Sequence, residues 1–298
     1  MGQEGHNPEK EKKTGNEDRK RKIEEETGAQ SKKACIDNEV CIRYLGGENT
    51  GIAVLSLNRP AARNALSCKI VEELQTAIAD ITEDETVRCL VLASQVEGVF
   101  CAGADLKERC RMSQANVAEF LKKLNNLVTA LEDLPVPVIA VVEGPALGGG
   151  LELILGCDMR VGTTSAMFGL PETGIGVIPG AGGTVRLGGL VGWGRARQMV
   201  LTGCRVGGSQ AEEWGLLNTC VEAGAGYHTA LEMARKVATG APLAVKMAKV
   251  ALRSTEKIQR DAALRVESSC YQRILSSSDR LEGIRAWADK RKPIFRGK

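Results

Sequence analysis

Hydrophobic residues along the chain gather in short runs separated by polar, glycine-rich and proline-rich segments. Runs rich in Val, Ile and Leu between turn residues are typical of buried strands, whereas apolar residues at every third or fourth position indicate a helix. The first pattern predicts strands at residues 40–45, 51–57, 87–93, 137–142, 159–163 and 166–168. The second predicts a helix capped by Ser67 and a longer helix at 113–131. A turn at 46–49 joins the first two strands, which therefore read as a hairpin.

The order strand, strand, helix, strand recurs through the first two thirds of the chain, and this alternation predicts an α/β core. From Thr184 onward helices dominate, and the segment after about Ala230 is poor in strand patterns. We therefore expect three parts: a tail at 1–38, an α/β core at 39–229 and a helical C-terminal region at 230–298.

The first 38 residues differ in composition from the rest of the chain. They contain few apolar residues, and charges of both signs alternate with Gly, Asn and Gln. Such a segment buries too little surface to offset its ordering entropy, so we expect disorder. It lacks the apolar stretch of a secretory signal, and its acidic residues are unlike a mitochondrial transit peptide. Its basic pairs suit either a nucleic-acid patch or a solvated tail, and the interleaved acids favour the tail.

Composition excludes several classes of protein. Aromatic residues make up only 3 % of the 298 residues, so the core must be aliphatic, and the net charge of +3 indicates no basic surface. No stretch has the apolar length needed to span a bilayer, so we expect no membrane association. The ten cysteines form no CxxC pair, which fits the reduced thiols of an intracellular protein and predicts no metal site. With only two histidines, acid–base chemistry falls to carboxylates.

The stretch at 144–152 stands out because three glycines, Gly148, Gly149 and Gly150, lie where a strand gives way to an apolar helix. Glu152 falls in the first turn of that helix. Glycine allows a ligand to approach the backbone, and unpaired N–H groups at a helix start attract negative charge. The stretch is either a tightly packed turn or a place to hold a developing oxyanion. No GxGxxG or GxxxxGK[ST] spacing occurs, so a nucleotide site is disfavoured.

Two further segments carry candidate chemistry. Residues 100–107 follow a strand with small residues whose N–H groups are accessible, and residues 168–172 end on a second carboxylate, Glu172. Taken alone, Glu152 is most simply a partner for the helix dipole and Glu172 a surface or helix-start residue. Together, two sets of N–H donors and two carboxylates are what the chemistry of an acyl enolate needs.

On these segments, with 156–158 and 178–184, the chain from Val40 to Lys298 resembles the crotonase (enoyl-CoA hydratase/isomerase) superfamily. Residues 105–109 and 279–283 are most similar to its methylglutaconyl-CoA hydratase branch, which includes an AU-rich-RNA-binding hydratase. The resemblance implies an α/β spiral of ββα units with a C-terminal helical trimerisation region, assembled as a homotrimer or homohexamer.

The resemblance also implies roles for particular residues. The N–H groups of Ala104 and Gly149 would form an oxyanion hole for the thioester oxygen. Glu152 would activate water for attack at Cβ, and Glu172 would protonate Cα. Contacts to coenzyme A or the acyl group would come from Ala62, Arg63, Ala102, Gly103, Asp105, Leu106, Lys107 and Gly148. Coenzyme A enters as part of the substrate thioester, so no separate cofactor is expected, and no metal.

Two positions depart from the family pattern: Val185 stands where Gln is frequent, and Ala61 where many members carry Lys near the coenzyme phosphates. The implied activity is hydration of a short or branched 2-enoyl-CoA, with 3-methylglutaconyl-CoA as one candidate. The alternatives are Δ3–Δ2 isomerisation, in which one glutamate commonly suffices, and RNA binding. The helix after the hairpin carries Lys69 among many acids, which disfavours nucleic acid. The sequence favours the cytoplasm, and the family the mitochondrion.

Overall fold

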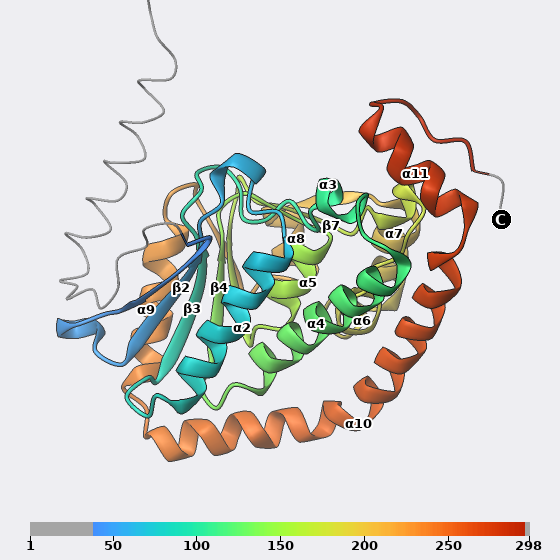
Figure 1. The fold of residues 1–298 in the computed structure, drawn as a ribbon. Helices are drawn as coiled ribbons and strands as arrows, with labels where there is room; N and C mark the ends of the chain where they lie inside the picture. Colours follow the sequence, from blue (N-terminus) through green and yellow to red (C-terminus); the bar gives the residue numbers. More distant parts are fainter. Residues whose placement is uncertain (1–37, 296–298) are drawn as a thin grey trace, which may run out of the picture.

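The computed structural model describes residues 38–295, without the side chains of residues 254–260, 263 and 273 (Figure 1). The predicted disordered tail lies outside the described residues except for its last position. The predicted hairpin is confirmed: β1 (Val40–Tyr44) pairs antiparallel with β2 (Ile52–Leu57).

A six-stranded sheet forms the centre of the fold, in the order β1-β2-β3-β4-β6-β9. Its other strands are β3 (Cys89–Ser94), β4 (Val138–Val142), β6 (Met159–Thr163) and β9 (Thr219–Val221). All neighbours after the hairpin are parallel. Parallel strands are buried on both faces, and alternate residues of β2 accordingly enter two cores: Leu55 and Leu57 face one, Ile52 and Val54 the other.

A second, three-stranded sheet has the order β5-β7-β8. It consists of β5 (Pro145–Leu147), β7 (Met167–Gly169) and β8 (Arg205–Gly207). Thus β4 and β6 each lie in the large sheet and are followed at once by a strand of the small one. With the helices that follow, this alternation gives the expected spiral of ββα units. The sequence pattern predicted β7 but not β5, β8 or β9, although all four strands are three residues long.

Helices cover both faces of the large sheet (Figure 1). The helices α2 (Cys68–Glu83) and α4 (Gln114–Asp133) lie over one face, and α9 (Gly226–Ala238) over the other. The side-chain oxygens of Ser67 and Ser113 accept the N–H groups of Ile70 and Asn116, so both predicted helix starts are confirmed.

The remaining helices connect the strands or follow the last of them along the chain. They are η1 (Gly47–Asn49), η2 (Pro60–Ala62), α3 (Leu106–Arg109), α5 (Gly149–Leu155), η3 (Glu172–Ile175), α6 (Gly183–Val191), α7 (Trp193–Thr202), α8 (Gly208–Glu213), α10 (Pro242–Leu275) and α11 (Ser278–Ala288).

The 34-residue helix α10 runs along the base of the molecule and up one side (Figure 1). Its Lys249 is buried and ties it to the large sheet: Nζ donates to Val136 O at 2.9 Å and pairs with Asp158 Oδ2 at 2.7 Å. The same carboxylate oxygen accepts the Val138 N–H that opens β4. The predicted boundary at 229/230 falls within α9, which contacts β3 and β4, and the division into parts stays a prediction.

Eight cysteines of the described part are free thiols, from Cys68 to Cys270. Cys41 in β1 instead takes part in a disulfide bond, so the expectation of reduced thiols is wrong for that residue. Within residues 38–295, no helix combines the length and apolar character needed to cross a bilayer. The same residues contain no cluster of His, Cys, Asp and Glu with the makings of a metal site.

Candidate active site

The segments singled out in the sequence converge because they follow parallel strands of the large sheet, whose carboxyl ends share an edge. The loop after β3 leads to α3, and the stretch after β4 leads through β5 to α5. Together with η3 and the C-terminal helices they enclose a cavity of about 120 Å³. Its lining includes Ala102, Gly103, Ala104, Leu106, Gly148, Gly149, Glu152 and Glu172.

Two backbone N–H groups, those of Ala104 and Gly149, lie next to each other in the lining of this cavity. Leu66 N donates to Gly103 O at 2.8 Å, and Asp105 N donates to Leu66 O at 3.1 Å. Because successive N–H groups of an extended chain point in opposite directions, that of Ala104 points away from Leu66. Gly149 opens α5, so its N–H has no acceptor within the helix. A Cβ on Gly149 would lie 3.9 Å from Ala104 N, so the two donors are neighbours.

Glu152 is 3 % exposed and its side chain is held by two backbone donors. Its Oε1 accepts Ala181 N and Gly183 N, both at 2.8 Å. Burial, together with the charge of Glu267, raises the pKa of Glu152 to about 7, while the two N–H groups oppose this rise. The carboxylate is therefore oriented by fixed dipoles and remains able to exchange a proton near neutral pH.

Glu172 is the first residue of η3 and faces the same cavity. Its Oε1 lies close to Gly148, where a Cβ would come within 2.9 Å of it, and the φ of +52° there also favours glycine. Its Oε2 is buried and has no hydrogen-bond partner among the described residues. Burial and the charge of Glu152 raise the pKa of Glu172 to about 8. Because Glu152 accepts two backbone N–H groups and Oε2 of Glu172 accepts none from the described residues, we infer that Glu172 is the more readily protonated of the two.

A third carboxylate, Glu267 of α10, supports the loop that holds Glu152. Its Oε1 accepts Gly182 N at 2.7 Å, and its Oε2 accepts both Thr184 N at 3.2 Å and the Thr184 hydroxyl. Four consecutive residues, 181–184, therefore direct their N–H groups alternately to Glu152 and to Glu267. This contact could not be predicted from the sequence, because it joins positions 85 residues apart that share no motif.

Arg186 secures the same loop from the other side. It is buried, donates to Ala181 O at 3.0 Å, and forms a bidentate pair with Glu132 of α4 at 2.9 and 2.8 Å. Arg186 also helps to lower the pKa of Glu152 and Glu267 against the effect of burial. Its neighbour Val185, at the position that departs from the family pattern, is half-buried.

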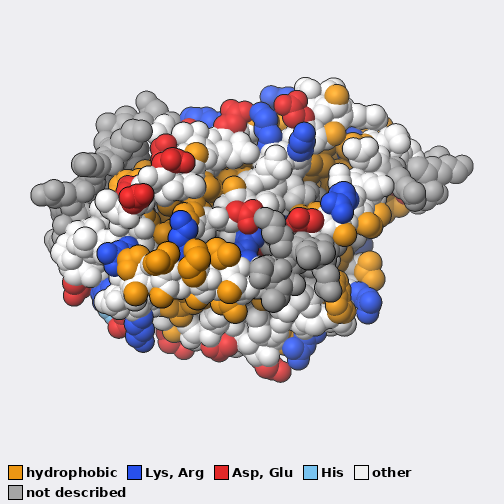
Figure 2. Space-filling model, turned by 90° about the horizontal axis from the view of Figure 1, so that it is seen from below, with side chains coloured by type: hydrophobic (Ala, Val, Ile, Leu, Met, Phe, Trp, Pro, Cys, Tyr) orange, Lys and Arg blue, Asp and Glu red, His pale blue; other side chains and the backbone are white. Residues whose placement is uncertain are grey.

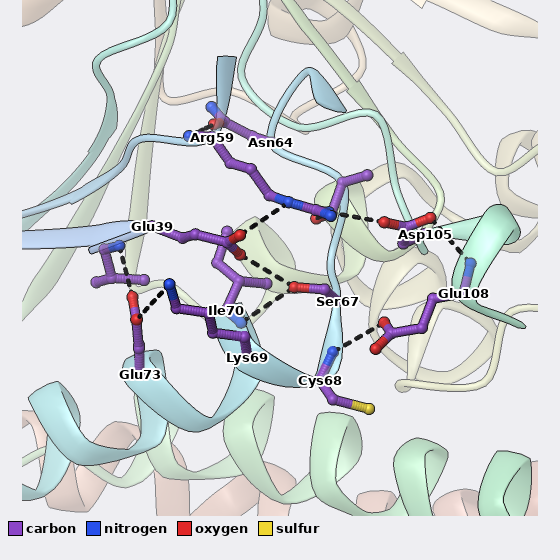
Figure 3. Close-up of polar contacts among 12 residues, drawn as sticks. Glu39, Arg59, Asn64, Ser67, Cys68, Lys69, Ile70, Glu73, Asp105 and Glu108 are labelled. Carbon is purple, nitrogen blue, oxygen red and sulfur yellow. Dashed lines mark hydrogen bonds and ion pairs between the residues drawn. The ribbon is translucent and has the colours of Figure 1, made fainter. Parts of the chain in front are cut away.

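A polar network centred on Arg59 joins the loop after β2 to Asp105, the residue that follows Ala104 (Figure 3). The guanidinium of Arg59 pairs with Glu39 at 3.1 Å and with Asp105 at 2.8 Å. The backbone N–H of Arg59 donates to Asn64 Oδ1 at 2.7 Å. Asn64 in turn donates to Phe100 O at 2.8 Å. The segments on either side of Ala104 and the loop after β2 are therefore held as one unit.

The residues predicted to contact coenzyme A fall into two groups. Ala102, Gly103, Leu106 and Gly148 line the cavity. Ala62, Arg63, Asp105 and Lys107 do not line it: Arg63 and Lys107 are exposed beside it, and Ala62 is half-buried.

Asp105 has a structural partner of its own. Its carboxylate caps α3 through the N–H groups of Lys107 and Glu108 and pairs with Arg59. Burial opposes the charged form, but these contacts hold the pKa of Asp105 below its ordinary value. Its role in binding stays a prediction, as do those of the other seven positions.

Among the lining residues that were not predicted, three have polar side chains: Arg109, Tyr271 and Arg280. Arg280 lies in the 279–283 stretch, which was used only as a family marker. Arg109 ends α3, one helical turn beyond Leu106, and an i, i+3 relation to a lining residue is a signal that could have revealed it.

The raised pKa values of Glu152 and Glu172 carry a cost in stability that depends on pH. Between about pH 5 and pH 8, Glu172 is ionised in the unfolded chain but protonated in the folded one, so the free energy of unfolding falls as pH rises. Each unit of raised pKa contributes about 1.4 kcal/mol to this loss. We predict that Glu172→Gln flattens the decline and makes the protein more stable than wild type at pH 8.

Urea unfolding at pH 5 to 8 measures this effect. Glu213→Gln, at an exposed position of α8, is the matched control and should keep the wild-type slope. Equal slopes for wild type and Glu172→Gln would contradict the assignment.

Comparison with known proteins agrees with this geometry. Residues 47–298 match the enoyl-CoA hydratase/isomerase family. The chain is 45 % identical over 264 residues to enoyl-CoA hydratase domain-containing protein 2, mitochondrial, of Mus musculus, covering 87 % of this chain and 89 % of the relative. It is 39 % identical over 265 residues to methylglutaconyl-CoA hydratase, mitochondrial, of Homo sapiens, covering 88 % and 78 %.

The fold also matches solved structures. The crystal structure of an enoyl-CoA hydratase from Bacillus anthracis superimposes with a TM-score of 0.72 at 38 % identity, covering 88 % of this chain and all of that one. The motifs, the spiral of ββα units and these relatives lead to one conclusion. The chain belongs to the enoyl-CoA hydratase/isomerase (crotonase) family and is an enzyme of that family.

Proposed function

We propose that the protein adds water across the 2,3 double bond of a short or branched 2-enoyl-CoA. The observation that carries this proposal is the pair of carboxylates in one cavity, Glu152 and Glu172, whose pKa values rise to about 7 and about 8 beside two convergent N–H donors. Near neutral pH one carboxylate can be ionised while the other keeps its proton, as hydration requires.

The proposed reaction assigns each proton. The ionised Glu152 takes a proton from water as the water oxygen bonds to Cβ. The electron pair of the double bond moves toward the thioester oxygen, where the N–H groups of Ala104 and Gly149 stabilise the negative charge. Glu172 then delivers its proton to Cα, which completes the 3-hydroxyacyl product. Coenzyme A enters with the substrate, so the proposal requires no separate cofactor and no metal.

The size of the cavity supports a small acyl group. A protein cavity of about 150 Å³ holds a benzene molecule, and the cavity here is about 120 Å³. A chain of about five or six carbons is comparable in size, which includes the branched acyl group of 3-methylglutaconyl-CoA.

Isomerisation of a 3-enoyl-CoA uses the same oxyanion site but commonly needs only one carboxylate, so the presence of both favours hydration. RNA binding has little support, because Lys69 and Lys123 beside the outer face of α2 lie against the carboxylates of Glu73 and Glu72. The compartment is proposed from the relatives alone: their names include the mitochondrion and give the cytoplasmic expectation no support. Fractionation of cells expressing the full chain would test this placement.

Replacing either glutamate by glutamine keeps its shape and removes its proton transfer. We predict that Glu152→Gln and Glu172→Gln each lower kcat for crotonyl-CoA hydration by about 10²- to 10⁴-fold. The dissociation constant for a saturated acyl-CoA should change little, because neither carboxylate is assigned to binding coenzyme A. Glu213→Gln serves again as the control. Activity within threefold of wild type in either glutamine variant of the pair would overturn the two-carboxylate mechanism.

We also propose that the chain assembles with copies of itself through α10. Leu243, Met247 and Val250 are 71, 47 and 54 % exposed and recur at helical spacing, so they form one apolar stripe. Figure 2, viewed from the side of α10, shows a band of hydrophobic side chains on this face. Exposed apolar patches of this kind mark protein–protein contacts.

Light scattering should give the mass of three or six chains of 31.8 kDa each. Met247→Glu should shift the assembly toward single chains, whereas Leu252→Glu, on the opposite side of α10, should not. A wild-type protein that is monomeric at micromolar concentration would contradict the proposal.

A further inference from the structure

The carboxylate of Glu172 is held in a different way from that of Glu152. Glu152 Oε1 accepts two backbone N–H groups at 2.8 Å, whereas Oε2 of Glu172 is buried and has no hydrogen-bond partner among the described residues. The place of the Glu172 carboxylate therefore depends on the backbone of η3, of which Glu172 is the first residue. Whatever holds that turn also holds the group that would protonate Cα of the acyl chain.

The turn η3 is short, and hydrogen bonds join its two ends. Gly176 N donates to Thr173 O at 3.2 Å, and Val177 N donates to Glu172 O at 3.1 Å. A shift at the end of the turn is therefore passed on to Glu172. The turn is also tied to α7, because the Thr173 hydroxyl donates to Val200 O at 3.1 Å.

Helix α11 meets the end of the same turn in direct backbone contact. A Cβ on Gly283 of α11 would lie 2.3 Å from Ile175 O, and a Cβ on Gly176 would lie 2.6 Å from Asp279 O. Ordinary contacts need about 3.5 Å, so a side chain at either position would drive the two backbones apart by about 1 Å. Two glycines, one on each element, therefore set the distance between α11 and η3.

This contact is the principal attachment of α11. Among the described elements, α11 packs most extensively on η3. Neither Gly283 nor Gly176 lines the cavity, although Ile284, the next residue of α11, does. The two glycines can therefore influence the reaction only through the elements that they hold together.

We propose that Gly283 and Gly176 are positioning residues: they hold α11 against η3 and so hold Glu172 at the distance from Cα that proton transfer requires. This inference rests on the proposed hydratase activity and adds what positions its general acid. A reacting group must be placed closely, and a displacement of about 1 Å can lower a rate about 100-fold.

Gly283→Ala tests the contact from the side of α11. Alanine favours a helix more than glycine does, so α11 itself should persist while its distance from η3 grows. We expect kcat for crotonyl-CoA hydration to fall by about 10- to 100-fold. The dissociation constant of butyryl-CoA, which cannot react, should change much less. Gly189→Ala, at an exposed glycine of α6 with open space around it, is the matched control and should keep the wild-type kcat.

The configuration of the product separates a displaced acid from a general loss of stability. In D₂O, hydration places one deuteron at Cα, and delivery by a fixed Glu172 gives a single configuration of the resulting CHD centre, which proton NMR resolves. When the acid is displaced, solvent also delivers the deuteron, so Gly283→Ala should give both configurations. A variant that is merely less stable would lose rate and keep the single configuration.

Gly176→Asn tests the same contact from the side of the turn. Gly176 has a φ of +74°, which asparagine tolerates, but the asparagine Cβ would still meet Asp279 O. This variant should show the same loss of rate and of single configuration. Gly224→Asn is its control, because Gly224 has a φ of +88° and lies exposed with open space around it.

Urea unfolding shows which variants fold, and if one of the two does not, the other carries the test. Wild-type kcat in a folded variant, or a lowered kcat with a single product configuration, would overturn the inference while the hydratase assignment stands. If the wild-type protein hydrates neither crotonyl-CoA nor 3-methylglutaconyl-CoA, the proposed function itself fails.

Discussion

The site depends on the loop at residues 181–184, whose four N–H groups point alternately to two carboxylates from different parts of the chain. Ala181 and Gly183 hold Glu152 of α5, and Gly182 and Thr184 are held by Glu267 of α10. Because a carboxylate that accepts backbone N–H groups has a fixed position, the loop transfers the placement of α10 to Glu152. Helix α10 is therefore part of the candidate active site, and it also carries the candidate surface for assembly.

This arrangement balances two electrostatic requirements. A general base must be ionised, which fixed N–H dipoles favour, and a general acid must keep its proton near neutral pH, which burial favours. Both influences act on Glu152, whereas Oε2 of Glu172 is buried and accepts no hydrogen bond from the residues that the structure describes. The difference between the two surroundings separates their roles. The same burial lowers the free energy of unfolding, as is common where proteins place reactive groups.

Much of the fold could be predicted because its signals are local. Ser67 and Ser113 cap helices through contacts within three residues, and the buried strands show as apolar runs between turns. Glu152 and Glu172 could be nominated because glycine and proline motifs flank them. The short strands β8 and β9 could not be predicted, since three residues are too few to show a periodic pattern of apolar side chains. Glu267 could not be predicted, because its importance arises only when α10 meets the loop at residues 181–184.

We infer that the fold raises the pKa values of the neighbouring Glu152 and Glu172 well above the ordinary range and makes Glu152 the more acidic of the two. Carbon-13 NMR of protein labelled at the glutamate side-chain carboxyls, titrated from pH 4 to 10, measures this directly, with Glu152→Gln and Glu172→Gln used to assign the signals. We expect two carboxyl groups to titrate near and above neutral pH, and the carboxyl of Glu152 to titrate at the lower pH. Titration of both at the ordinary value near 4.5 would contradict it.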